Sequence, residues 1–378
     1  MQVIPCQRQH FAIPDEIHYL NCAYMSPLSH AVVEAMARGA ASKQRPWEYQ
    51  PADFFSVSEA SRERAAQLAG VESDSIAIVP SVSHALATAA RNLPLARGQQ
   101  VVTLGDQFPS NIYVWRELAA ECGGGVISVQ RDADAAWTDA VLDAIGPDTG
   151  IVAVPHCHWA DGRIVDLEAV GHKCREYGAA LVLDLTQSLG AMPLDFAKVQ
   201  PDFAVAACYK WLMGPYGTGL LYVDPCYHDG QPIEHNWMNR AGSENFARLV
   251  DYRDDFQPGA RRFDMGEKAN PALLYGASKG LDFLLGFGVD AIAHTLAQQT
   301  DALADGARAL GLSAPAADVR APHFLALGFP EGVPDGLTDR LAERNVFVSL
   351  RGTSLRVTPH LYNNEADHQA LLETLRDC

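Results

Sequence analysis

The chain has 378 residues, which at roughly 150 residues per domain predicts two or three domains. Its 29 Lys and Arg residues against 46 Asp and Glu residues give a net charge of −17. This excess of acid argues against nucleic acid and anionic membrane surfaces as partners, because both require a basic footprint. Hydrophobic residues make up 48% of the chain and charged residues 20%, a composition typical of a globular protein.

The sequence shows no signal for export or membrane insertion. No apolar run approaches the roughly 20 residues of a membrane helix, and the N-terminal stretch lacks the basic segment and apolar core of a signal peptide. The eight cysteines are scattered without a C-x-x-C pair, which disfavours a zinc ribbon and a thioredoxin motif. We therefore expect a cytoplasmic protein with reduced thiols.

Short apolar segments alternate with helix-like segments through the first two thirds of the chain. We expect strands at residues 75–79, 100–104, 151–155, 180–184, 203–206 and 219–223, and helices at residues 85–93, 111–122 and 166–177. This alternation is typical of parallel βαβ units, and the apolar character of the strands predicts a sheet covered on both faces.

After about residue 255 the pattern changes to longer helices and fewer strands. Helices are expected at residues 271–287, 291–310 and 366–376, and strands at residues 324–327, 346–350 and 354–358. We therefore predict a large α/β domain over residues 15–258 and a small C-terminal α+β domain over residues 259–378, which residues 1–14 join.

Three short motifs resemble functional sites but lack the structural context of one. The G-x-S-x-G pattern around Ser278 requires a strand followed by a sharp turn, whereas its flanks predict one continuous helix. The glycine-rich loop at residues 214–219 precedes a strand, and a dinucleotide-binding loop would follow one. No further His or Cys completes a metal site with His156, Cys157 and His158. Because the context is lacking, a serine hydrolase is kept only as an outside alternative, and we expect no metal site.

An acid and a lysine are expected at the same edge of the sheet. Asp184 ends the strand at 180–184, and Lys210 follows the strand at 203–206. Ligands of open α/β sheets bind at the carboxyl ends of the strands. A salt bridge on the rim of the sheet would explain the same pair, so these two residues alone leave both interpretations open.

Seven motifs stand in order along the chain, among them Asp-Leu-Thr-Gln at 184–187 and Tyr-Lys at 209–210. The others lie at residues 19–23, 81–84, 108–111, 261–263 and 355–363. Together they resemble the class V aminotransferase family of pyridoxal-phosphate (PLP) enzymes, which includes cysteine desulfurases, kynureninases and isopenicillin-epimerase-like proteins. The resemblance covers nearly the whole chain. It implies PLP fold type I (aspartate-aminotransferase-like), with a mostly parallel central sheet and a smaller C-terminal domain, and pyridoxal 5′-phosphate as the cofactor.

The resemblance implies a role for the residues around the cofactor ring. Lys210 would form an imine with PLP and then move the α-proton of the substrate. Asp184 would pair with the pyridine nitrogen and keep it protonated, and Gln187 would hydrogen-bond the phenolic oxygen. Phe108 would stack on the pyridine face, with core packing as the alternative.

The resemblance also implies contacts to the cofactor phosphate. Val82, Ser83 and His84 would hold it at the start of the following helix, where free N–H groups favour an anion; Ser83 would equally suit a helix N-cap. Tyr209 would contact the phosphate or relay a proton. Trp159 faces the cofactor or the substrate at a position where desulfurases carry Asn.

Arg356 matches the family's residue for the α-carboxylate of the substrate, with Arg351 as a nearby rival and Asn21 as a second substrate contact. A guanidinium offers a bidentate fork for a carboxylate. The family forms homodimers with active sites at the subunit interface, where a short segment contacts the neighbouring subunit's cofactor. Glu267 and Lys268 replace the usual Thr-Pro of that segment, so either is a candidate for the contact.

Two kinds of reaction on an amino acid are open. The main prediction is transamination or related α-proton chemistry through an imine between PLP and the substrate. The alternative is a lyase, either a C–S lyase or a kynureninase-like C–C hydrolase. Residues 345–354 hold no cysteine, and Ala207 replaces the Ser that desulfurases carry there, which disfavours a persulfide-forming desulfurase. A non-catalytic PLP-fold binding protein is the outside alternative.

Overall fold

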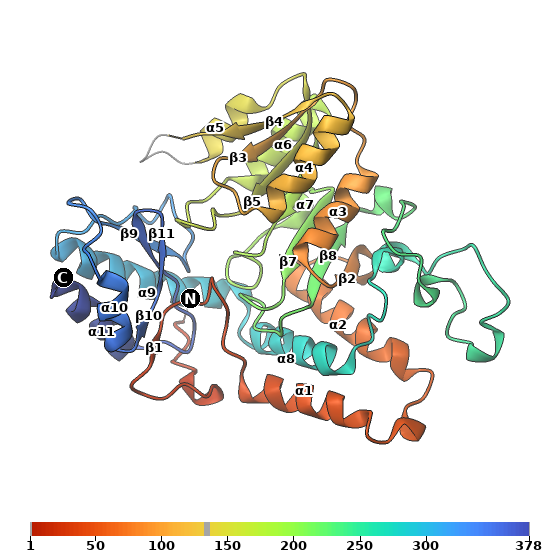
Figure 1. The fold of residues 1–378 in the computed structure, drawn as a ribbon, viewed down its shortest axis with the longest axis horizontal. Helices are drawn as coiled ribbons and strands as arrows, with labels where there is room; N and C mark the ends of the chain where they lie inside the picture. Colours follow the sequence, from red (N-terminus) through yellow and green to blue (C-terminus); the bar gives the residue numbers. More distant parts are fainter. Residues whose placement is uncertain (1, 132–136, 378) are drawn as a thin grey trace.

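A seven-stranded sheet forms the centre of the larger unit in the computed structural model, which describes residues 2–131 and 137–377 (Figure 1). Its strands lie in the order β2 (Ile76–Val79), β8 (Gly219–Val223), β7 (Phe203–Ala207), β6 (Ala180–Asp184), β5 (Thr149–Pro155), β3 (Gln100–Leu104) and β4 (Gly125–Val129). β8 runs antiparallel to both of its neighbours, and the other pairs are parallel. The mostly parallel sheet predicted from the alternating segments is therefore confirmed.

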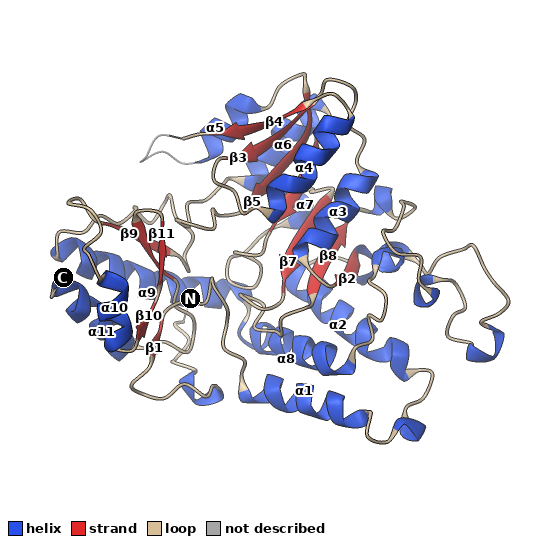
Figure 2. Ribbon diagram, in the orientation of Figure 1, coloured by secondary structure: helices blue, strands red, loops and turns tan. Residues whose placement is uncertain are grey.

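Helices cover both faces of this sheet (Figure 2). They are α3 (Val82–Asn92), α4 (Ser110–Glu121), α5 (Trp137–Ala144), α6 (Leu167–Tyr177) and the short α7 (Phe196–Val199). Consecutive residues of a strand point to opposite faces. Val101 of β3 accordingly packs in a core with residues of α3 and α4, whereas Val102 packs in a second core with residues of α5 and α6.

A further layer of helices lies beside the β2 end of the sheet. It consists of α1 (His30–Ser42), α2 (Asp53–Ala69) and α8 (Pro271–Phe287), and α8 packs against the other two. Gly39 allows α1 to approach α8, because a Cβ there would overlap the carbonyl oxygen of Pro271. Ser278 lies inside α8 with its Oγ 2.6 Å from that of Ser61. The predicted continuous helix is therefore confirmed, and Ser278 is not at a strand-to-helix turn.

The smaller unit combines α9 (Val289–Ala309), α10 (Leu337–Glu343) and α11 (Glu365–Arg376) with two small sheets. In the first, β12 (Ser354–Val357) pairs antiparallel with β11 (Ser349–Arg351) and β9 (Leu325–Gly328); in the second, β1 (His18–Tyr19) pairs parallel with β10 (Val346–Phe347). The single strand predicted at 346–350 is wrong, because its two halves pair with different partners. Through β1 the N-terminal segment joins this unit, on whose side both chain ends lie (Figure 1).

The division of the chain at 258/259 stays a prediction. α8 packs on α1 and α2 of the larger unit, whereas α9 contacts β9 and α11 of the smaller one, and the two helices meet at a bend of 79°. This packing favours a boundary at that bend. Across the described residues no single helix is long and apolar enough to cross a membrane; α8 and α9 reach that length and composition when taken together as a bent pair.

A buried cluster of charged side chains binds the segment before α8 to strand β2 of the sheet. The carboxylate of Asp264 lies 2.7 Å from Nη2 of Arg62 and 2.6 Å from Nζ of Lys268, and it also accepts the N–H of Ile78 in β2 at 2.7 Å. All three charged side chains are almost fully buried. Removing Asp264 would take from Lys268 its ion-pair partner and leave Arg62 with Glu59 alone, which is far costlier than losing an exposed pair.

We expect Asp264→Asn to lower the free energy of unfolding by about 3–5 kcal/mol, measured by urea titration. Asp305→Asn is the matched control, because Asp305 pairs with Arg308 at 2.9 Å on an exposed surface, and its loss should change stability by about 0.5 kcal/mol or less. Equal effects of the two substitutions would contradict the structural role of the cluster.

Candidate active site

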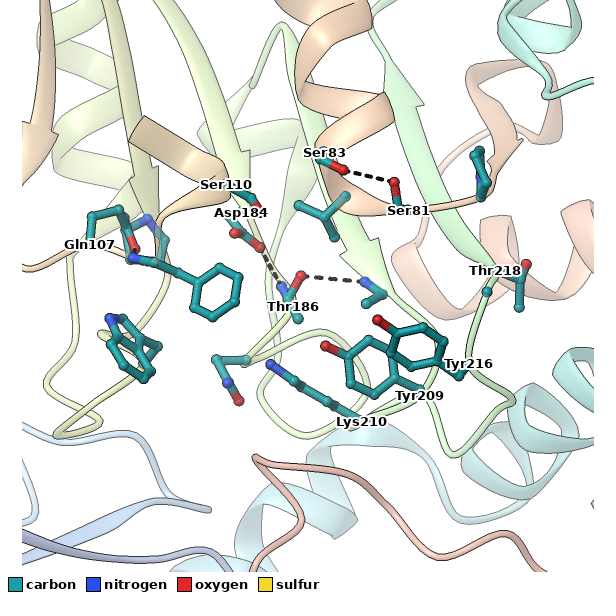
Figure 3. Close-up of a pocket in the computed structure, with 18 of the residues that line it drawn as sticks. Ser81, Ser83, Gln107, Ser110, Asp184, Thr186, Tyr209, Lys210, Tyr216 and Thr218 are labelled. Carbon is teal, nitrogen blue, oxygen red and sulfur yellow. Dashed lines mark hydrogen bonds between the residues drawn. The ribbon is translucent and has the colours of Figure 1, made fainter. Parts of the chain in front are cut away.

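The candidate site is a pocket at the carboxyl ends of β5, β6 and β7, next to the start of α3. Its walls include Asp184, Lys210, Ser83, Phe108 and Trp159. Figure 3 shows Lys210 and Tyr209 on one side of the pocket, with Asp184 and the first turn of α3 across from them. The sequence placed most of these side chains at one edge of the sheet, and the structure brings them together there.

The side chain of Lys210 is buried, and among the described residues it forms no ion pair with Asp184 or any other acid, so the rim salt bridge is not formed. Burial lowers the pKa of Lys210 to about 8; the negative charge of Asp184 opposes this and the positive charge of Arg356 adds to it. Near neutral pH such a lysine has a far larger unprotonated fraction than a lysine in water, and the unprotonated form is the one that attacks a carbonyl carbon.

Asp184 lies at the end of β6 with its side chain buried. Its Oδ1 accepts the backbone N–H of Thr186 at 3.0 Å. Burial raises the pKa of Asp184, and the hydrogen bonds from Thr186 and the charge of Lys210 only partly oppose this. A buried carboxyl without a bonded cation is suited to a ligand that supplies one, such as a protonated pyridine nitrogen.

The first turn of α3 offers unpaired donors to the pocket. α3 begins at Val82 rather than near residue 85, and its N-cap is Ser81, whose Oγ accepts the N–H of His84 at 3.2 Å. Ser83 is therefore not the cap; its Oγ lies 2.9 Å from that of Ser81. Because the cap satisfies only the N–H of His84, the N–H groups of Val82 and Ser83 are left for an anion.

His84 lies away from this pocket wall. Its Nδ1 is 3.8 Å from a carboxylate oxygen of Glu234, and burial lowers its pKa. The structure therefore does not bring the His84 ring to the other predicted phosphate contacts.

Two aromatic rings form the outer wall. Phe108 meets Trp159 edge-on with ring centroids 5.6 Å apart, and Nζ of Lys210 lies 5.5 Å from the centroid of Phe108. The Phe108 ring is 39% exposed, so it is not a core residue. The Trp159 indole is held in place because its Nε1 donates to the carbonyl of Asp106 at 2.7 Å. A flat ring placed against Phe108 would be covered on one side.

The glycine-rich loop contributes a wall that the sequence reasoning missed. Tyr216 and Thr218 line the pocket, and the rings of Tyr209 and Tyr216 lie 4.6 Å apart, beside Lys210 (Figure 3). Tyr216 is 69% exposed. The loop follows Lys210 directly in the chain, and this position could have predicted that it lines the pocket. The sequence was tested only for a dinucleotide-binding loop, which this loop is not.

The predicted substrate contacts lie beyond Trp159, toward the smaller unit. Nη1 of Arg356 donates to the carbonyl of Trp159 at 2.9 Å, whereas its buried Nε has no partner. No acid within the described residues pairs with it, and burial, with the nearby charge of Arg351, lowers the pKa of Arg356 to about 9. Asn21 accepts from Ser349, the residue opposite Arg356 in the β11–β12 pair, at 2.9 Å. A buried, unpaired guanidinium is suited to a carboxylate.

Lys268, Glu267 and His158 lie outside the wall of the candidate pocket. Lys268 belongs to the buried Asp264 cluster, so of the two candidates for a contact across a subunit interface Glu267 is the exposed one. Nε2 of His158 lies 3.2 Å from the carbonyls of Gly105 and Asp106. In the part of the chain that the structure describes, no group of three or more His, Cys, Asp or Glu residues could hold a metal ion.

Comparison with known proteins agrees with this geometry. The family model described as Aminotransferase class-V matches residues 19–362. An uncharacterized aminotransferase, YcbU, of Bacillus subtilis is 28% identical over 326 residues, which cover 84% of this chain and 82% of YcbU. A kynureninase of Burkholderia mallei is 28% identical over 278 residues, covering 68% of this chain and 63%, less than two thirds, of the relative.

Solved structures with the same fold include cysteine-processing enzymes. The apo structure of a cysteine desulfurase from Thermococcus onnurineus superimposes with a TM-score of 0.87 at 20% identity, over 100% of this chain and 99% of that one. The cystine C–S lyase C-DES gives a TM-score of 0.86 at 20% identity, over 96% and 98%. At such identity the likeness concerns the fold, and it confirms the predicted fold class, PLP fold type I.

We expect pyridoxal phosphate to attach to the cofactor-free protein at a rate that rises with pH around a midpoint near 8, rather than near 10.5 as for an unperturbed lysine. Below the lowered pKa the amine of Lys210 keeps its proton and is unreactive; above it the amine is free. The growth of visible absorbance across this pH range measures the rate. Lys210→Ala is the control and should give no adduct after borohydride reduction; a midpoint near that of a free lysine would contradict the effect of burial.

Proposed function

This chain belongs to the class V aminotransferase family of PLP-dependent enzymes, which act on amino acids, and we propose that its reaction is transamination or a related α-proton transfer at Lys210. The family predicted from the ordered motifs is thereby confirmed. The observation that carries the proposed reaction is the single pocket that holds the buried Lys210 amine, the unpaired Asp184 carboxyl and the free N–H groups of α3.

The residues around the pocket fit PLP. Asp184 would bind the protonated ring nitrogen, the first turn of α3 would bind the phosphate, and Phe108 would cover one face of the ring. When bound, PLP supplies an electron sink for the bonds at the α-carbon of an amino acid. The protein then determines which bond is broken by orienting the substrate.

The other residues of the site would bind the substrate or transfer its α-proton. Arg356 would hold the α-carboxylate with its free Nε and the second amino group, and thereby align the α-hydrogen with Lys210. Lys210, whose pKa is lowered to about 8, would in its unprotonated form accept the α-proton and return it elsewhere on the substrate–cofactor system. Tyr209, whose ring centroid lies 5.4 Å from Nζ of Lys210, would assist this transfer. Trp159 would keep water from the substrate side.

A lyase is the second candidate, and one observation limits which kind it would be. β10, β11 and β12 span the segment where a persulfide-forming desulfurase needs a mobile cysteine, and residues 345–354 contain none. A C–S lyase that releases sulfur directly, or a kynureninase-like C–C hydrolase, needs no such cysteine. A pure binding protein is disfavoured, because binding alone gives no reason to bury an unpaired lysine with a lowered pKa.

We further propose a homodimer in the cytoplasm. Large aromatic side chains are exposed near the open side of the pocket and on the α1–α8 layer: Trp47, Tyr216, Trp237 and Tyr275. A second copy packed on these rings would remove them from water and complete the wall beside Tyr216. The seven described cysteines are free thiols, which suits a reducing compartment. Sedimentation velocity of the holoenzyme tests the dimer, and a monomer at micromolar concentration would contradict it.

The reaction is tested by mixing the holoenzyme with single amino acids and following both the visible spectrum and the products. Transamination gives a 2-oxo acid and leaves the amino group on the cofactor. A C–S lyase gives sulfide or a persulfide together with pyruvate and ammonia, and a kynureninase-like enzyme gives alanine from its substrate. Peptide mapping after borohydride reduction should place the cofactor on Lys210. A colourless protein that gains no label from added PLP would contradict the proposal.

We expect Arg356→Ala to lower kcat/KM for the best amino acid found by this screen at least tenfold, since a lost charge-assisted hydrogen bond is worth roughly 1.5–3 kcal/mol. Arg356→Lys should recover part of the loss, because the charge remains and the fork does not. Arg308→Ala, on an exposed pair of the smaller unit, is the control without effect. A change below threefold in Arg356→Ala would remove the carboxylate-binding role.

A further inference from the structure

The side-chain amide of Gln187 is held at both ends. Its Oε1 accepts the indole N–H of Trp211 at 2.9 Å, and its Nε2 donates to the carbonyl of Ala23 at 3.2 Å. An indole nitrogen only donates and a carbonyl oxygen only accepts, so these contacts together fix which end of the amide is oxygen and which is nitrogen. The amide cannot turn over without placing like groups against each other at both ends.

This orientation determines what Gln187 presents to the pocket that it lines. One N–H of Nε2 is used by Ala23, and Oε1 is used by Trp211. The second N–H of Nε2 has no partner among the described residues and is left to donate to a ligand. Trp211 and Gln187 are both buried, so water does not compete for the contact between them.

His323 holds the main chain of the same residue. Its Nε2 lies 2.5 Å from the carbonyl oxygen of Gln187, so the proton of the neutral ring is on Nε2. Its ring meets that of Trp211 edge-on, with centroids 4.2 Å apart. Burial lowers the pKa of His323 to about 3, so the ring keeps this neutral form across the working pH range. His323 comes from the segment before β9, so Gln187 is held from both units of the protein.

We propose that Trp211 and His323 are positioning residues that hold the Gln187 amide with an N–H toward the phenolic oxygen of the bound cofactor. The inference rests on the proposed function, in which Gln187 contacts that oxygen, and extends it to two residues without cofactor contact of their own. Trp211 directly follows Lys210 in the chain. The loop that carries the lysine therefore also carries the side chain that orients the amide.

The expected consequence is spectroscopic. An N–H donor at the phenolic oxygen stabilises negative charge there, so the bound chromophore loses its proton at lower pH than it would without the donor. In Trp211→Phe the amide keeps its contact with Ala23 but loses the one at Oε1, so its second N–H is no longer held toward the cofactor oxygen. We expect the apparent pKa of the visible band of the holoenzyme to rise by about one pH unit, the size expected for a lost hydrogen bond to a charged acceptor.

Two comparisons separate positioning from general damage. Trp115 is equally buried, and its Nε1 donates to Oδ1 of Asn111 at 2.9 Å, outside the pocket wall. Trp115→Phe is therefore the matched control and should leave the pKa of the band unchanged. Gln187→Ala should raise it as much as Trp211→Phe, and the double variant should raise it no further, because both act through one hydrogen bond.

The outcomes are distinct. A raised pKa in Trp211→Phe, no change in Trp115→Phe and non-additivity with Gln187→Ala would support the proposal. An unchanged pKa in a folded Trp211→Phe holoenzyme, or additive shifts, would overturn it. If Trp211→Phe does not fold, His323→Phe decides by the same measurement, with a smaller rise expected and no rise overturning the proposal. A wild-type protein that binds no PLP would instead overturn the proposed function, and the two failures are therefore distinguishable.

Discussion

The burial of the Lys210 amine, with no ion pair to any acid in the described part of the chain, is the constraint on which the rest of the site depends. The loop that carries it is closed by its own backbone: the N–H of Cys208 donates to Thr218 at 3.0 Å, and that of Gly214 donates to Cys208 at 2.8 Å. The loop also packs closely against α8 at Gly280. A side chain there would collide with the loop, because its Cβ would lie 2.8 Å from the carbonyl oxygen of Met213. Core packing and backbone hydrogen bonds, not a salt bridge, therefore keep the amine in place.

The charged groups around the pocket are complementary to a ligand that carries negative groups at two places and a positive group at a third. The amine and the Arg356 guanidinium are cationic groups kept from acids, the first turn of α3 adds unpaired N–H donors, and Asp184 is a buried carboxyl kept from cations. Each of these groups is unfavourable in isolation, because a buried charge or donor without a partner costs free energy. A ligand that carries a phosphate, a ring nitrogen and a carboxylate relieves all of them at once.

The sequence predicts best those elements whose bounds are set by residues close together in the chain. β3, β6, β8 and α8 were predicted with the bounds observed, since their apolar runs and flanking residues define them locally. β4 was not predicted because most of its residues are only partly buried. α1 and α2 were not predicted because they pack on α8, which lies far along the chain. In the site, the ordered motifs located Lys210, Asp184 and Gln187, but the cap of α3 and the role of Tyr216 depend on how loops meet in space.

Two of the hydrogen bonds between the units involve residues that we propose to act on the substrate and on the cofactor ring. Arg356 of the smaller unit donates to the carbonyl of Trp159, and His323 lies against the carbonyl of Gln187. The same boundary thus carries the guanidinium proposed for the substrate carboxylate and the imidazole proposed to help fix the donor at the ring oxygen. Because both contacts lie on one boundary, a displacement of the smaller unit relative to the sheet would alter both of them together.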